Sequence, residues 1–187
     1  MKKLFIFALF LKLNLYAQDL NYLQQKVAII NFKTMLQRQE NKLGSSSFYY
    51  IKKLNNSSFR IESRVSLNSS QAPKTIVLLG MYSIYDNCTN EPLGYLNYDI
   101  DIYNDCYINE FHIHPKYRNK KIGKLLLNFA IEKFKEKKIK TLRLVAIPYN
   151  ENEMTERDLI KYYEKFRFKK SGAFMHLQLD NNITSKL

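Results

Sequence analysis

The sequence of 187 residues contains no tryptophan, only five glycines and four prolines, and two cysteines. So little glycine and proline excludes a collagen-like repeat, and 45% hydrophobic with 25% charged residues excludes a chain that is disordered throughout. Long apolar runs are also missing, which excludes a protein that crosses a membrane many times. The length is close to that of one domain and can bury a core without disulfides or metals as staples.

Acidic residues are scarce, since 17 Asp and Glu stand against 30 Lys and Arg, a formal net charge of +13. Such a charge favours anionic partners: nucleic acid, a membrane surface or a phosphorylated cofactor. The charge is unevenly placed, with ten basic and two acidic residues over 116–140 and six acidic and no basic residues over 83–110. This pattern is typical either of two solvated faces or of a site with an anionic ligand on one side and a cationic one on the other.

Residues 1–17 resemble a secretory signal, with a charged start, an apolar run and a small residue near the end. Lys12 interrupts the apolar run after eight residues, whereas a spanning helix needs about 20. We therefore expect an export signal or a peripheral membrane association. The alternative is a short buried helix or strand at the start of the fold.

The two cysteines, Cys88 and Cys106, lie at opposite ends of a predicted strand. At about 3.3 Å per residue, this separation exceeds the reach of a disulfide. We expect two free thiols, which favours a reducing compartment.

The hydrophobic pattern predicts one helix, then antiparallel strands, and then two helices that alternate with strands. The fold class is therefore α+β or mixed α/β in a single domain. A first helix is expected over 18–42, from apolar positions that include Val27, Ile30 and Leu36. Short turns between the strands that follow indicate an antiparallel meander. The strands are expected at 59–67, 75–86, 92–103, 106–113, 141–147, 168–171 and 173–179.

Two further helices are predicted. One begins after Pro115 and carries its apolar residues on a single stripe. The stripe consists of Ile122, Leu125, Leu126, Phe129, Ala130 and Phe134. The other begins at Thr155, which forms a near capping box with Asp158.

The most informative segment is the loop between the strand that ends at Ile113 and the helix that follows it. The first turn of a helix has backbone N–H groups with no internal partner and a positive potential, so it is a ready anion site. Four basic residues surround this terminus, and Gly123 would let the backbone approach a phosphate. The basic residues are Arg118, Lys120, Lys121 and Lys124. The segment is not a P-loop, because Leu125 stands where that motif needs Ser or Thr. It is not a dinucleotide-binding G-x-G-x-x-G motif either, because Gly123 is its one glycine.

Residues 117–126 resemble the acyl-CoA loop of the GNAT superfamily of N-acetyltransferases, and residues 162–168 resemble that family's C-terminal Tyr-Glu-Lys-x-Gly-Phe. Lys121 and Arg167 stand at family glycine positions. The resemblance implies a central, largely antiparallel sheet flanked by helices over 75–179. It leaves a helix and strand of uncertain role over 18–74 and a tail over 180–187.

The resemblance also implies acetyl-CoA as the co-substrate and direct attack by a primary amine, in a ternary complex. The backbone of Phe111, His112 and Ile113 would bind the pantetheine arm like an added strand. The amides and side chains of the loop would hold the diphosphate. The loop residues are Arg118, Asn119, Lys120, Lys121, Ile122, Gly123 and Lys124.

An amine must lose its proton before it attacks, since its ordinary pKa is near 10. Glu110 is the predicted base, with a salt-bridging role as the alternative, and His112 is the reserve base. Tyr163 matches the family tyrosine that protonates the departing thiolate, with core packing as the alternative, whereas Tyr162 is expected to face another side. Asp99 and Asp101 share a strand face and would suit a cationic acceptor such as a polyamine, an aminoglycoside-like amine, a lysine side chain or a peptide N-terminus.

Two other functions remain open at this stage. One is a GNAT-like module that binds CoA without catalysis, because Lys121 and Arg167 replace family glycines. The other is a basic nucleic-acid-binding protein, but the run 133–140 contains Phe134 as its one aromatic residue, so we expect no nucleic-acid partner. No Cys/His spacing indicates zinc, so no metal is expected. Acetyl-CoA use points to a cytoplasm, the protein's own or a host's, whereas a signal peptide points to export. The sequence indicates no particular oligomeric state.

Overall fold

The structure is a computed structural model that describes residues 24, 27, 30–38, 48–53, 58–67, 76–148 and 154–179. The chain divides into two compact units, Met1–Gln39 and Glu40–Leu187. The predicted signal segment, residues 1–17, and the predicted tail, residues 180–187, lie outside the described residues.

In the first unit, residues 30–38 are helical, as are the described residues 24 and 27, in agreement with the predicted helix. Its buried side chains are Phe32 and Leu36, four residues apart and each 4% exposed. Val27 and Ile30, two of the apolar positions that indicated the helix, are 55% and 60% exposed. Spacings of three and four residues are met by more than one stripe here, and the pattern alone did not distinguish them.

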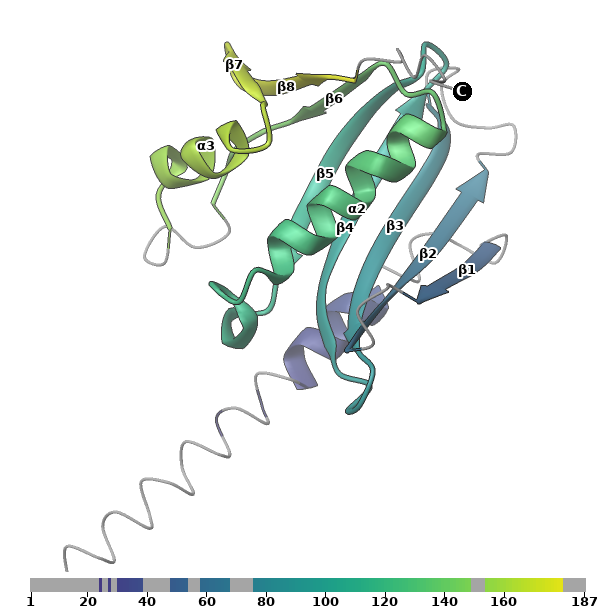
Figure 1. The fold of residues 1–187 in the computed structure, drawn as a ribbon, viewed down its shortest axis with the longest axis vertical. Coiled ribbons are helices and arrows are strands. Elements are labelled where there is room, and N and C mark those ends of the chain that lie inside the picture. Colours follow the sequence, from purple (N-terminus) through teal and green to yellow (C-terminus); the bar gives the residue numbers. More distant parts are fainter. Residues whose placement is uncertain are drawn as a thin grey trace, which may run out of the picture. The chain divides into compact units, whose positions relative to one another are not determined.

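The second unit is built on an eight-stranded sheet in the order β1-β2-β3-β4-β5-β6-β8-β7 (Figure 1). Neighbouring strands pair antiparallel except β5 and β6, which are parallel. The largely antiparallel sheet is thus confirmed. The strands are β1 (Phe48–Lys53), β2 (Phe59–Leu67), β3 (Ile76–Asp86), β4 (Pro92–Asp101), β5 (Asp105–Ile113), β6 (Thr141–Leu144), β7 (Lys169–Ser171) and β8 (Phe174–Gln178).

Three strands differ from the prediction by more than one residue at an end, one of them being β6, which ends at Leu144 instead of residue 147. β1 was not predicted, and it extends the sheet beyond β2 at one edge. β4 ends at Asp101 instead of residue 103, because Asp101 Oδ1 accepts the backbone N–H groups of Tyr103 and Asp105 and closes a turn there. An Asp that bonds backbone N–H groups ahead of it competes with the continuing ladder.

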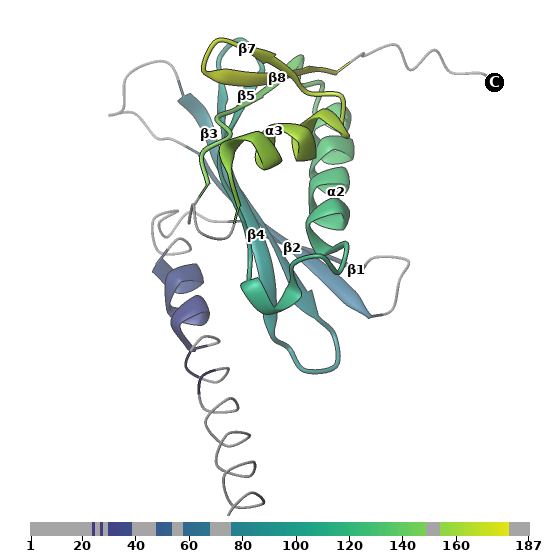
Figure 2. The ribbon, with the colours of Figure 1, turned by 90° about the vertical axis from the view of Figure 1, so that its left-hand side faces the viewer.

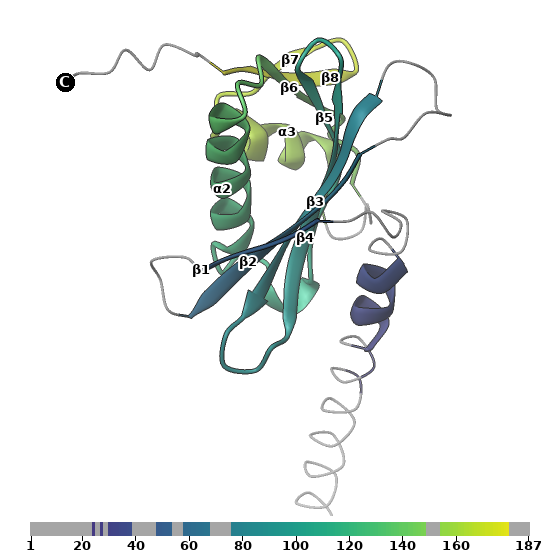
Figure 3. The same ribbon diagram turned by 90° about the vertical axis from the view of Figure 1, so that its right-hand side faces the viewer.

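Three helices follow β5 or β6: the short 3-10 helix η1 (Pro115–Tyr117), α2 (Ile122–Glu136) and α3 (Glu156–Glu164). The helices α2 and α3 lie on the same side of the strands (Figures 2 and 3). The predicted stripe of α2 is confirmed at four of its positions, which are buried, while two positions are partly buried. The buried residues of α2 are Ile122, Leu126, Leu127, Ala130, Ile131 and Phe134.

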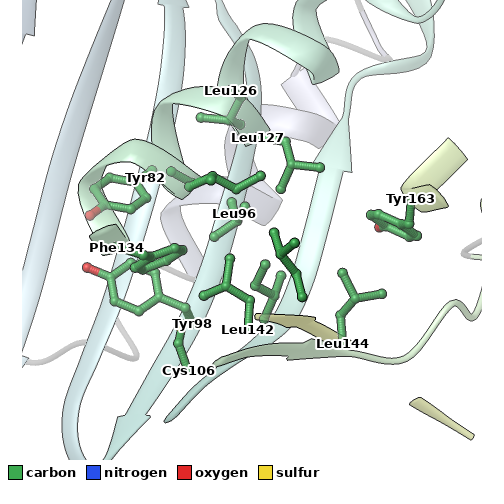
Figure 4. Close-up of a cluster of buried hydrophobic side chains, with 14 of the residues drawn as sticks. Tyr82, Leu96, Tyr98, Cys106, Leu126, Leu127, Phe134, Leu142, Leu144 and Tyr163 are labelled. Carbon is green, nitrogen blue, oxygen red and sulfur yellow. The ribbon is translucent and has the colours of Figure 1, made fainter. Parts of the chain in front are cut away.

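The core between α2 and the sheet is centred on aromatic rings (Figure 4). Tyr98 of β4 lies against Phe134 with ring centroids 4.8 Å apart and stacks on Tyr82 at 5.1 Å. A Cβ at Gly80 would lie 2.1 Å from the Tyr98 ring, so this glycine admits the ring over β3. Burying rings of this kind is worth about 1.5–3 kcal/mol each and fixes α2 on the sheet. Cys106 is buried in this core and Cys88 is exposed; both thiols are free.

Candidate active site

An irregularity in β5 decides which side chains share a face. Asn97 of β4 pairs with Glu110 whereas the next residue, Tyr98, pairs with Ile108, so Asn109 is an extra residue in β5. Such a bulge shifts the alternation of the strand by one residue. As a result Glu110 and His112 point away from α2, while Phe111 and Ile113 lie on the side of the two helices.

The carboxylate of Glu110 is held by two donors from β4. Its Oε2 accepts a hydrogen bond from Tyr95 Oη at 3.0 Å and from Asn97 Nδ2 at 3.3 Å. His112 stacks on the Tyr95 ring with centroids 5.8 Å apart. Two donors on one oxygen fix the orientation of the carboxylate. The predicted base is therefore a positioned carboxylate, and its role as the base stays a prediction.

Tyr163 of α3 lies on the opposite side of β5 from Glu110. Its side chain is 6% exposed and packs against Phe168 and Phe111, with centroid distances of 5.8 and 6.5 Å. Figure 4 places it at the α3 end of the core, beside Leu144. Burial raises the pKa of its hydroxyl well above the ordinary value, so the group is protonated at physiological pH.

The strands β5 and β6 form a ladder over part of their length. The last parallel pair is Ile108 with Leu144, where β6 ends, whereas β5 continues to Ile113 alongside β4. Beyond that pair the sheet is split between β5 and the chain that follows β6 (Figure 1). The predicted pantetheine-binding residues Phe111, His112 and Ile113 all lie in this stretch of β5.

The loop from β5 to α2 contains two residues in the left-handed conformation, Asn119 with φ 60° and Lys121 with φ 64°. Lys121 is the residue at which the family pattern has glycine, and the loop keeps the backbone geometry that favours glycine. Arg118 Nε donates to the carbonyl of Ile113 at 3.1 Å and ties the loop to the end of β5. Arg118 therefore has a structural contact that the sequence did not predict.

The N-terminus of α2 has no cap from its own residues. Its N-cap is Lys121, which makes no side-chain cap hydrogen bond, and no acidic residue lies in the first turn. Lys120, Lys121 and Lys124 are exposed around it, and Lys120 Nζ lies 5.6 Å from the centre of the Tyr117 ring. Uncapped N–H groups, the helix dipole and three ammonium groups together can attract an anion. The predicted contacts of the loop residues with a diphosphate stay a prediction.

Gly123 has a close packing contact that the sequence did not predict. A Cβ at this position would lie 3.0 Å from Tyr162 Oη and 3.3 Å from Ile113 Cγ1. The glycine thus admits side chains of α3 and β5, and its role toward a phosphate stays a prediction. Tyr162, expected to face another side, lies against the start of α2 and stacks on Phe111 at 6.4 Å.

The buried hydroxyl of Tyr162 makes no hydrogen bond with any residue of the described chain. Leaving a buried polar group unpaired costs about 1–3 kcal/mol. The sequence did not single out Tyr162, because its missing hydrogen bond becomes visible only when the packing around Gly123 is known.

The acidic run over 83–110 does not act as one surface. Glu91 accepts from the hydroxyl of Tyr117, and Asp105 pairs with Arg143 at 2.7 Å. The carboxylate of Asp101 accepts the two backbone hydrogen bonds that close the turn after β4. Its predicted role toward a cationic acceptor stays a prediction. Asp99, on β4, makes no hydrogen bond or ion pair with the described residues, and its predicted role toward a cationic acceptor stays a prediction.

His114 follows β5 and is 3% exposed. Its Nδ1 accepts the backbone N–H of Lys116 at 3.2 Å, which caps η1, and its ring lies against Tyr117. The sequence did not indicate this buried capping role of His114.

Within the described part of the chain, no group of three or more His, Cys, Asp and Glu residues is placed to hold a metal ion. No helix in that part is long and apolar enough to cross a membrane.

A mixed sheet that divides between β5 and β6 thus lies next to a helix terminus that has no side-chain cap. The sequence model of the acetyltransferase (GNAT) family matches residues 47–168. This match covers more than half of the chain, which therefore belongs to the acetyltransferase (GNAT) family, a family of acyltransferases. The matched segment includes β1 and β2 as well as the residues that carry the two signatures. Among curated proteins, none matches the sequence significantly.

Solved structures of the same family are similar to this chain. The PaiA N-acetyltransferase of Thermoplasma acidophilum, in complex with coenzyme A, is 25% identical over 53% of this chain and 60% of its own, with a TM-score of 0.43. The ribosomal-protein-S18-alanine N-acetyltransferase of Escherichia coli is 15% identical, covering 58% and 71%, with a TM-score of 0.44. A GNAT-family acetyltransferase of Staphylococcus aureus Mu50 is 20% identical, covering 54% and 68%, with a TM-score of 0.42. The match thus spans less than two thirds of the Thermoplasma protein.

Proposed function

We propose that this protein is an N-acetyltransferase that transfers an acetyl group from acetyl-CoA to a primary amine by direct attack in a ternary complex. The observation that carries the proposal is the N-terminus of α2, which follows the end of β5, has no cap of its own and is surrounded by Lys120, Lys121 and Lys124. A diphosphate matches this terminus in charge and in hydrogen-bonding capacity. The residues present therefore fit the co-substrate.

Acetyl-CoA would be held by two parts of the chain. The loop from Arg118 to Lys124 would bind the diphosphate, and β5 beyond Ile108 would bind the pantetheine arm, along the stretch where β6 has ended. When bound, the co-substrate supplies an acyl carbonyl that is activated as a thioester.

Glu110 would accept the proton that the amine loses as it attacks. Its carboxylate is already oriented by Tyr95 and Asn97, so little reorganisation is needed. Glu110 and Tyr163 lie on opposite sides of β5, and the division between β5 and β6 would let groups from the two sides meet.

Tyr163 would donate a hydrogen bond to the departing sulfur. The pKa of an ordinary thiol is about 8.5, well below the raised pKa of this buried tyrosine, so the tyrosine keeps most of its proton. Hydrogen bonding thus suits Tyr163 better than the full protonation that the family resemblance implied. Tyr163→Phe should accordingly lower turnover more than CoA affinity.

The test combines calorimetric titration with CoA and an acetyl-transfer assay against a panel of polyamines, lysine peptides and free peptide N-termini. We expect CoA binding by the wild type and transfer to at least one amine. Glu110→Gln keeps one oxygen that can accept from both Tyr95 and Asn97, and it should lower turnover by about 100-fold while CoA affinity is unchanged. Equal turnover in this variant would remove Glu110 as the base.

A module that binds CoA without catalysis is the second candidate, suggested by the non-glycine residues at family glycine positions. Lys121 and Arg167 both have positive φ, 64° and 69°. The backbone geometry that glycine would provide is therefore kept at both positions, which weakens this alternative. Binding of CoA without transfer to any amine, in wild type and Glu110→Gln alike, would favour it.

A further inference from the structure

The hydroxyl of Tyr162 is buried within the protein and has no hydrogen-bond partner in the described chain. Buried polar groups in folded proteins are nearly always paired, and an exception calls for a specific explanation such as a ligand. A phenylalanine would fill the same space against Phe111 and Phe166 without the unpaired oxygen. The hydroxyl therefore contributes nothing to the packing of the free protein.

The position of this hydroxyl coincides with the proposed co-substrate site. It lies 3.0 Å from where a Cβ of Gly123 would stand, at the second residue of α2, and Ile113 at the end of β5 borders the same point. This is the junction between the strand assigned to the pantetheine arm and the helix terminus assigned to the diphosphate. Three features therefore converge: the uncapped terminus, the missing side chain at Gly123 and the unpaired hydroxyl.

We propose that Tyr162 is a cofactor-binding residue whose hydroxyl donates a hydrogen bond to an oxygen of acyl-CoA where the pantetheine arm joins the diphosphate. This assignment rests on the proposed function. It is distinct from the role of Tyr163, which packs deeper, between Phe111 and Phe168.

The protonation state of Tyr162 suits a donor. Burial raises the pKa of Tyr162 to about 12, so the hydroxyl keeps its proton throughout the physiological range. A hydroxyl that keeps its proton can donate to a phosphate or amide oxygen, and Tyr162 Oη has no acceptor in the described chain.

The experiment measures two quantities on Tyr162→Phe: CoA affinity by calorimetry and stability of the free protein by urea unfolding. We expect the Kd for CoA to rise about five- to tenfold, as for the loss of one hydrogen bond, while the urea midpoint is unchanged or higher because an unpaired polar atom has been removed. A packing role would leave the Kd unchanged, whether or not the urea midpoint falls, and would overturn the proposal.

The control is Tyr103→Phe, which removes a hydroxyl from a tyrosine that is 68% exposed in the turn between β4 and β5. Its CoA affinity should equal that of the wild type. Titration with pantetheine and with ADP then locates the acceptor. A loss for pantetheine places it on the arm and a loss for ADP on the diphosphate, and both support the proposal.

The two hypotheses fail in different ways. If the wild type does not bind CoA, the proposed function fails and the assignment of Tyr162 fails with it. If the wild type binds CoA and Tyr162→Phe binds it equally well, the function stands and Tyr162 is a packing residue.

Discussion

The two long helices of the second unit begin in opposite ways. The helix α3 is capped by Thr155, whose hydroxyl accepts the N–H of Asp158 while the Asp158 carboxylate accepts the N–H of Thr155, and Glu156 adds a charge to the first turn. The helix α2 begins at Lys121 with no side-chain cap and no acidic residue in its first turn.

Both helices have the same unsatisfied N–H groups and the same dipole, so the difference lies in what satisfies them. At α3 the chain itself supplies the acceptors, and the hydrogen bonds with Thr155 hold the pKa of Asp158 below its usual value. At α2 the chain supplies lysines, which intensify the positive potential. The first arrangement stabilises the fold, whereas the second suits a ligand that brings the negative charge.

The largest expected effect comes from reversing the charge at α2. The double variant Lys120→Glu, Lys121→Glu should weaken CoA binding about 100-fold, because two attractions with a diphosphate become repulsions. Calorimetry at low and high salt checks this, and the difference from the wild type should shrink as salt rises.

The matched control is Lys169→Glu, Lys170→Glu on β7, which changes the net charge by the same amount. These lysines are exposed and lie at the opposite end of the unit from the start of α2 (Figure 2). Their variant should keep the affinity within about twofold of the wild type. Equal losses in both variants would mean that net charge alone attracts CoA, and the contrast between the helix termini would lose its functional meaning.

A medium effect is expected at the capped helix. Thr155→Ala removes the side-chain acceptor for the N–H of Asp158 and should lower the free energy of unfolding by about 1 kcal/mol. Urea unfolding measures this change, and CoA affinity should stay as in the wild type. A loss of CoA affinity without a loss of stability would show that the capped terminus also serves the ligand.

The same contrast shows what the sequence could predict. The capping box of α3 was readable because Thr155 and Asp158 are close in the chain, and the stripe of α2 was readable because burial follows the helical period. The basic loop before α2 was also recognisable, since charge and the family pattern are both local features of the sequence.

Other features depend on contacts between distant segments and were not readable. The bulge at Asn109 is defined by its pairing with β4, and it alone places Glu110 beside Tyr95 and Asn97. β1 is a strand because β2 lies beside it in register from Phe48 to Lys53. Likewise, the unpaired hydroxyl of Tyr162 depends on how α3 packs against Gly123, about forty residues earlier in the chain.

The smallest expected effect concerns backbone strain at the two positions where the family pattern has glycine. Lys121 and Arg167 have φ of 64° and 69°, and a left-handed residue other than glycine costs about 1–2 kcal/mol. Glycine loses about 0.5–1 kcal/mol more conformational entropy on folding, so Lys121→Gly and Arg167→Gly should each raise the free energy of unfolding by about 0.5 kcal/mol. Gly172→Ala is the reverse control. Gly172 has φ 61°, and no atom lies within 4 Å of the place where a Cβ would stand, so backbone strain alone should make this variant less stable. If urea unfolding shows a higher free energy of unfolding for Arg167→Gly and no change for Lys121→Gly, the loop before α2 is not strained in the free protein. Its left-handed turn is then part of the relaxed conformation of the helix terminus that we propose binds the diphosphate.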